Sequence, residues 1–148
     1  MSIQFTFERG GILIADFNKK APETISAISN ALKAPLTSQV FHTRWCGREI
    51  NFGLTTQNPP QKENYSSVVS KFDLVYWRHW EEPGKLVDGA PGNEALGIYY
   101  GAEALRFHQF PIYVNIFGRI RWEYEDLLEE IGVRIWQQGY EDVTAELV

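Results

Sequence analysis

SQVFHTRWCGREINF occupies residues 38–52, near the centre of the chain. Ser38–Trp45 alternates in side-chain character with a period of two, which is typical of a β-strand. Cys46-Gly47 indicates a tight reversal, and Arg48–Phe52 indicates the return strand. The first strand carries Val40, His42 and Arg44 on one face and Phe41, Thr43 and Trp45 on the other. The stretch therefore predicts an antiparallel β-hairpin.

Strand patterns continue on both sides of this hairpin. We expect further strands at residues 3–7, 12–17, 72–80, 95–100 and 112–121. Residues 55–70 and 81–93 are expected to be long loops. Helical spacing predicts helices at 21–33, where a proline stands in the first turn, and over most of 122–138. In the second helix, the residues expected to face inward are Leu127, Leu128, Ile131 and Ile135.

This order of elements predicts a mostly β fold with two helices. Many antiparallel strands with few helices are typical of a closed antiparallel β-barrel whose ends the helices cap. The chain has 148 residues and no repeat or linker divides it. We therefore expect residues 1–148 to form a single domain.

The distribution of charge argues against nucleic-acid binding. The net charge is −5, and the segment from Trp122 onward holds eight acidic residues against one basic residue, Arg134. An acidic segment repels phosphate, and no cluster of lysine and arginine compensates for it. We expect no nucleic-acid partner.

Three features predict a cytoplasmic protein without a membrane partner. No apolar run approaches the roughly 18 residues that a membrane helix needs. The N-terminal sequence lacks the basic and apolar segments of a signal peptide. The lone cysteine, Cys46, excludes an intramolecular disulfide and fits a reducing compartment.

Several local sequences resemble those of cyclophilins, in the same order along the chain. They are Ala21-Pro22-Glu23-Thr24, Phe41-His42-Thr43-Arg44-Trp45, Gly47-Arg48-Glu49-Ile50-Asn51, Ile98-Tyr99-Tyr100 and Ile116-Phe117-Gly118-Arg119-Ile120. The stretch from His42 to Glu49 also resembles a signature of small prokaryotic cyclophilin-like proteins of unknown function. The resemblance implies a cyclophilin-like barrel and brings no established activity with it.

The groove residues that the resemblance implies for prolyl isomerisation are largely replaced. Cyclophilins use an arginine where Thr43 stands here, and Arg44 lies one residue later, on the opposite face of a regular strand. A turn one residue tighter would return Arg44 to the groove. Charged Arg48 and Glu49 stand where an apolar proline pocket is expected. Two further differences are Asn51 in place of a glutamine and Val114 in place of a histidine.

Our leading interpretation is a domain that binds a small molecule or an extended peptide in a modified groove, without classical isomerase chemistry. The predicted ligand-binding residues are His42, Arg44, Glu49, Asn51, Tyr76 and Tyr99. A surface ion pair of Glu49 with Arg44 or Arg48, and aromatic side chains that form barrel core, are the competing interpretations.

Two other functions stay open at this point. A weak peptidyl-prolyl isomerase would use Arg44 as its best catalytic candidate. An assembly protein would form a homo-oligomer through the loop at 81–93 and through Trp136.

The remaining chemistry gives no further candidate. His42, His79 and His108 lack the spacing of metal ligands, and we expect neither a metal nor a cofactor. Cys46 is more typical of an inert turn cysteine than of a nucleophile. Hydrolase, zinc-protease and nucleotide-binding motifs are absent from the sequence.

Overall fold

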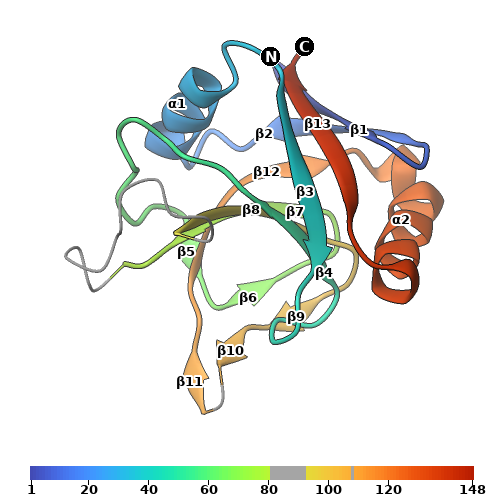
Figure 1. The fold of residues 1–148 in the computed structure, drawn as a ribbon. Helices are drawn as coiled ribbons and strands as arrows, with labels where there is room; N and C mark the ends of the chain where they lie inside the picture. Colours follow the sequence, from blue (N-terminus) through green and yellow to red (C-terminus); the bar gives the residue numbers. More distant parts are fainter. Residues whose placement is uncertain (81–92, 108) are drawn as a thin grey trace.

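A computed structural model describes residues 1–80, 93–107 and 109–148. Within these ranges, eight strands form a closed antiparallel barrel in the order β2-β1-β13-β3-β4-β8-β7-β12, and β12 pairs back onto β2 (Figure 1). Their bounds are β1 Ser2–Phe7, β2 Ile12–Phe17, β3 Leu36–His42, β4 Glu49–Gly53, β7 Asp73–Arg78, β8 Glu94–Tyr99, β12 Val114–Ile120 and β13 Glu141–Leu147. The predicted mostly β, closed barrel is confirmed.

Short strands extend the barrel at one end. They are β5 Tyr65–Ser66, which pairs with β12, β6 Val68–Val69 with β9 Glu103–Ala104, and β10 Arg106–Phe107 with β11 Phe110–Pro111. Apart from these pieces, the predicted loop at 55–70 is irregular. The predicted loop at 81–93 falls almost entirely outside the described residues, as does His108.

Side chains from alternate strand positions fill the barrel interior. The largest of these fully buried side chains are Tyr76, Phe5, Phe52 and Phe117. Phe5 and Phe52 meet edge to face with ring centroids 6.1 Å apart. The interior of this barrel is therefore packed core, as in other small barrels.

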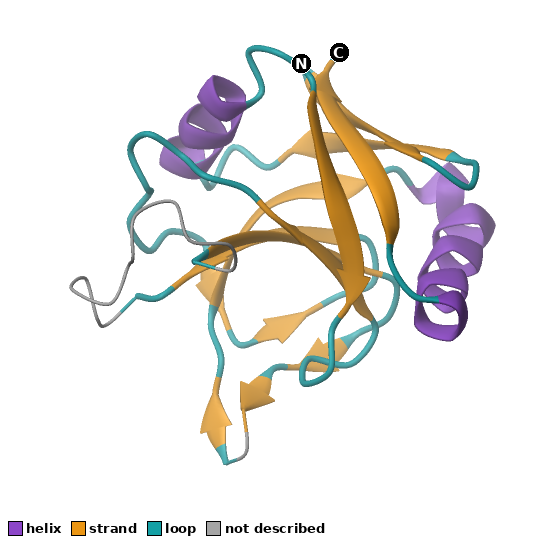
Figure 2. Cartoon of the chain, viewed as in Figure 1, coloured by secondary structure: helices purple, strands orange, loops and turns teal. Residues whose placement is uncertain are grey.

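Two helices cover the barrel at different sides (Figure 2). α1 Pro22–Ala31 begins with proline at its first position. α2 Glu125–Gln138 follows a 3₁₀ turn at Trp122–Tyr124 and buries Leu128, Ile131 and Ile135, as predicted, whereas Leu127 is partly buried. Neither helix has the length and apolar character that crossing a bilayer requires.

The last strand, β13, was not predicted from the sequence, and one predicted strand end is wrong. β13 pairs with β1 on one side and with β3 on the other, so it completes the barrel. It also brings the two ends of the chain together, since the Ser2 amide donates to the Val148 carbonyl at 2.9 Å (Figure 1). The strand expected to reach Trp45 ends at His42, and residues 43–48 form a loop.

Candidate functional site on the outer face of the barrel

A cavity of about 550 Å³ lies on the outer face of β4, β7, β8 and β12. Its lining residues are Thr43, Trp45, Cys46, Glu49, Asn51, Val75, Trp77, His79, Ala95, Gly97, Tyr99, Ile112 and Val114. The alternation of side chains between the two faces of a strand explains which residues line the cavity. Glu49 and Asn51 face outward because their neighbours Ile50 and Phe52 belong to the barrel core.

Much of the lining is apolar. Val75, Tyr99 and Val114 belong to a second buried cluster, separate from the core, against which Trp77 and Ile112 pack. This cluster lies on the outer side of the same strands that enclose the core. The cavity lining is therefore mostly apolar, with a few polar side chains among the apolar ones.

The loop at 43–48 contributes the remaining wall. The Thr43 hydroxyl accepts from the backbone amides of Trp45 and Cys46, both at 3.4 Å. Outside the cavity, the Arg48 guanidinium donates to Glu103 at 2.8 Å and to the Ala102 carbonyl at 3.1 Å. These bonds at both ends of the loop hold Trp45 and Cys46 beside the cavity.

Glu49 places a buried carboxyl group in this lining. The residue is 8% exposed, and the Asn51 amide donates to its Oε1 at 2.7 Å. Burial raises the pKa of Glu49 to about 7, and the nearby Tyr99 hydroxyl and the Asn51 amide oppose the shift. Within the described part of the chain, no lysine or arginine lines the cavity.

Gly97 makes room for this carboxyl group. A Cβ atom at residue 97 would stand 3.0 Å from Cδ of Glu49 and 3.0 Å from Cγ2 of Val75. Any larger residue at this position would push the Glu49 side chain away. The pairing of Asn51 with Gly97 and of Glu49 with Tyr99 across β4 and β8 fixes these neighbours in register.

The Tyr99 hydroxyl is the second unusual polar group. Tyr99 is fully buried, and its oxygen completes no hydrogen bond of good geometry with any described residue. Burial and the neighbouring Glu49 both raise the pKa of Tyr99, so the hydroxyl stays neutral. Burial also raises the pKa of Cys46 to about 11, which keeps this thiol protonated, as expected for an inert cysteine.

Three of the six predicted ligand-binding residues come together in the cavity: Glu49, Asn51 and Tyr99. The others lie elsewhere. His42 bonds through Nε2 to the Tyr100 hydroxyl at 2.6 Å, and Arg44 is exposed outside the lining. Tyr76 is in the barrel core, where its hydroxyl donates to Glu94 at 2.5 Å.

The structure brings some of the groove positions that the cyclophilin resemblance singled out to the cavity. Thr43 and Val114 line the cavity in place of the arginine and the histidine, and the turn does not return Arg44 to it. Glu49 faces the cavity, but Arg48 pairs with Glu103 on the surface. Among the described residues, Glu49 forms no ion pair with Arg44 or Arg48, which rules against the competing interpretation of a surface ion pair.

Sequence reasoning did not predict several lining residues, above all Trp77, Ala95 and Gly97. Trp77 lies beside Tyr76 in the predicted strand at 72–80, and the sequence pattern does not say which of these two aromatic side chains points outward. Gly97, a glycine inside an apolar strand, is itself a signal of close approach by another group. Its cross-strand position opposite Asn51 could be read only once the register was known.

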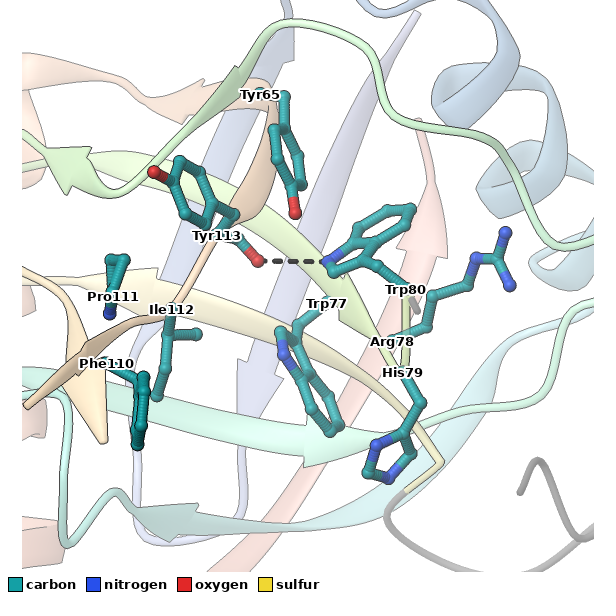
Figure 3. A pocket seen from close by; sticks show the side chains of 9 residues that line it. All are labelled: Tyr65, Trp77, Arg78, His79, Trp80, Phe110, Pro111, Ile112 and Tyr113. Carbon is teal, nitrogen blue, oxygen red and sulfur yellow. Dashed lines mark hydrogen bonds between the residues drawn. The ribbon is translucent and has the colours of Figure 1, made fainter. Parts of the chain in front are cut away.

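A second hollow of about 440 Å³ adjoins the cavity and shares Trp77, His79 and Ile112 with it (Figure 3). The Trp80 indole donates to the Tyr113 carbonyl at 3.0 Å (Figure 3). The ring of Tyr113 also stacks on that of Tyr65 with centroids 4.8 Å apart. Aromatic side chains therefore continue from the cavity along the outside of the barrel.

Comparison with known proteins places the chain in a family. The profile of the family described as "Protein of unknown function (DUF3830)" matches residues 9–146. The chain belongs to this family. No functionally curated protein gives a significant match to this DUF3830 protein.

Among solved structures, the DUF3830 chain is similar to one described as "Structure of McbB in complex with tryptophan". The TM-score is 0.69 at 17% sequence identity, and the match covers 97% of this chain and 44% of the McbB chain. The chain thus spans less than half the length of McbB. The likeness shows the fold, and it is compatible with a cyclophilin-like barrel.

Proposed function

We propose that this DUF3830 protein binds a small organic molecule in the cavity on the outer face of its barrel. The volume of about 550 Å³ is in the range of ligand pockets, and an apolar lining with a few polar groups is typical of them. The packed barrel interior leaves the outer face as the place for a ligand.

The observation that carries this proposal is the pair of buried polar groups beside the cavity. A buried carboxyl group without a cationic partner and a buried hydroxyl without a completed hydrogen bond both cost free energy in a folded protein. Glu49 and Tyr99 have these properties among the described residues. A ligand with hydrogen-bonding groups would offset that cost, whereas purely structural residues gain nothing from it.

A small molecule fits the site better than an extended peptide. Peptides that bind as an added strand need an exposed sheet edge. The eight barrel strands described above are paired on both sides, so they offer no such edge. Isomerase activity has less support than binding, because Thr43 takes the position of the arginine and Arg44 lies outside the cavity.

A thermal-shift screen of metabolites and fragments tests the proposal. Tryptophan belongs in the panel as one probe, because the McbB structure is described as a complex with it. We expect at least one compound to stabilise the wild-type protein. Ala95→Leu, which fills the cavity, should abolish that stabilisation, and Ala34→Leu at an exposed position should not.

Two results would contradict the proposal. If stabilising compounds act equally on the wild type and on Ala95→Leu, their site is elsewhere on the molecule. If no compound stabilises the wild type, the cavity has no small-molecule ligand of the classes screened.

A further inference from the structure

The polar groups of the cavity restrict the chemistry of a ligand more than its volume does. Among the described residues of the lining, the side-chain oxygens belong to Thr43, Glu49, Asn51 and Tyr99. The Asn51 amide nitrogen is committed to Glu49 Oε1, which leaves the second carboxyl oxygen of Glu49, the Asn51 carbonyl oxygen and the hydroxyls of Thr43 and Tyr99 to meet a ligand. Of these groups, the Glu49 carboxyl is the one that ionises near neutral pH, because burial and the neighbouring carboxyl hold the Tyr99 hydroxyl neutral.

The apolar part of the lining is suited to the same class of ligand. Trp45 and Trp77 are on the lining, and indole faces attract cations more strongly than other aromatic rings do. A carboxylate flanked by aromatic side chains is a common way to hold an organic cation. Anionic ligands, by contrast, would face Glu49 with no lysine or arginine from the described residues to offset it.

We propose that the cavity selects a ligand with a protonated amine on an apolar body, with Glu49 as the group that binds the ammonium. This inference rests on the proposed function and names the ligand class of that same site. The ammonium donates to Glu49, and the body packs on Val75, Trp77 and Val114. Asn51 is a positioning residue, because its amide holds Oε1 of the carboxylate.

Release of a proton when the ligand binds is a second measurable consequence of this inference. Because burial raises the pKa of Glu49 to about 7, most of the free protein carries a protonated carboxyl at about pH 6. An ammonium binds the ionised form, so binding at that pH must release a proton to the buffer. At about pH 8 the carboxyl is already ionised and the release disappears.

Other titratable groups around Glu49 do not produce this signature. Tyr99 faces it from β8 and Cys46 from the loop, and both stay neutral because burial raises the pKa of each. Strand β7 contributes Val75 and Trp77, which do not titrate. His79 also lines the cavity, so His79→Gln serves as the control for its contribution.

Three probes with the same body separate the ligand classes: 2-phenylethylamine, 2-phenylethanol and 3-phenylpropionate. Calorimetry on the full chain should show the amine binding at least about tenfold more tightly than the alcohol, the strength of one charge-assisted hydrogen bond. The acid should bind most weakly. Repeating the amine titration at about pH 6 in buffers of different ionisation enthalpy measures the released proton.

Glu49→Gln keeps the size of the side chain and removes its charge. We expect this variant to lose about tenfold or more in affinity for the amine, to keep its affinity for the alcohol and to release no proton. Glu130→Gln makes the same substitution at an exposed position on α2, outside the cavity, and should behave as the wild type. A proton release that disappears in His79→Gln and persists in Glu49→Gln would assign the proton to His79 and overturn the inference.

The outcomes separate this inference from the proposed function. If the alcohol or the acid binds as tightly as the amine, and Ala95→Leu abolishes that binding, the amine inference is overturned while the cavity remains a ligand site. Unchanged amine affinity in Glu49→Gln overturns it as well. Failure of the amine to bind at roughly millimolar concentration also overturns it, and the wider screen then decides the proposed function by itself.

Discussion

Glu49 is costlier to ionise in the folded protein than in the unfolded chain. Burial raises its pKa from an ordinary value of 4.5 to about 7. Between these two pH values the folded protein holds a proton that the unfolded chain has released. The free energy of unfolding therefore falls as the pH rises through this window, and it levels off above about pH 7.

The first prediction follows from this linkage. From about pH 4.5 to about pH 8, Glu49 should lower the free energy of unfolding by roughly 3 kcal/mol, and Glu49→Gln should remove that loss. Chemical denaturation of the wild type and of Glu49→Gln over this range measures the difference between them. Glu130→Gln should keep the wild-type slope. Parallel curves for the wild type and Glu49→Gln would show that Glu49 titrates normally.

At the residue scale, the sequence predicted part of the cavity for a simple physical reason. Glu49, Asn51 and Tyr99 occupy alternate positions on two strands, and alternation is visible in a sequence. Alternation does not place Tyr76 and Trp77, because the four central residues of β7 are all apolar or aromatic. The pattern therefore does not say which of the two points inward. Arg44 was misplaced because the strand ends at His42.

At the scale of single elements, the buried side chain of Glu141 holds the start of β13 in place. The Glu141 side chain accepts from the Arg9 backbone amide at 2.8 Å and from the Arg134 guanidinium at 2.9 Å. These contacts join the start of the last strand to the β1–β2 turn and to α2. Glu141 is 2% exposed, so its partners would be left poorly solvated without it.

The second prediction concerns this anchor. Glu141→Ala should lower the free energy of unfolding by about 3 kcal/mol, because Arg134 and the Arg9 amide lose their buried partner. Urea denaturation of the variant measures the change. Asp142→Ala, at the next position along β13 and less buried, should cost about 1 kcal/mol or less. Equal losses in the two variants would mean that Glu141 has no special role.

The third prediction concerns the contact of α2 with the barrel. A Cβ atom at Gly132 would stand 2.4 Å from a ring carbon of Tyr100, which is buried and bonded to His42. Alanine normally stabilises a helix relative to glycine, but here overpacking should outweigh that gain and cost about 1–3 kcal/mol. Thermal denaturation with Gln137→Ala as the helix control checks this. A more stable Gly132→Ala would contradict it.

The residue pattern of β13 and the position of its partner strands explain why the sequence did not predict it. Its inward positions are Glu141, Val143, Ala145 and Leu147, so a buried acid and a small residue weaken the apolar alternation. Its partners lie at the other end of the chain, with Phe5 opposite Ala145. Local patterns carry no information on such a pairing. The other barrel strands have stronger local patterns and were predicted from them.

For the whole molecule, the barrel is compatible with a cyclophilin-like fold, and Thr43 stands where the resemblance to cyclophilins implies the groove arginine. The fourth prediction is that a protease-coupled assay on X–Pro peptides gives only the uncatalysed rate. The physical reason is that Thr43 offers no charged donor to the proline nitrogen and Glu49 replaces an apolar pocket residue. A rate of X–Pro isomerisation above the uncatalysed rate that is lost in Arg44→Ala would contradict this prediction and support isomerase activity.

The most direct test of the account is to locate a bound ligand on the molecule. Amide chemical shifts of the ¹⁵N-labelled protein should be recorded during titration with the most stabilising compound of the screen. We predict that the shifts concentrate at Glu49, Asn51, Gly97 and Tyr99 and vanish in Ala95→Leu. Shifts that concentrate on α1 or α2, or that persist in Ala95→Leu, would contradict a ligand site on the outer face of the barrel.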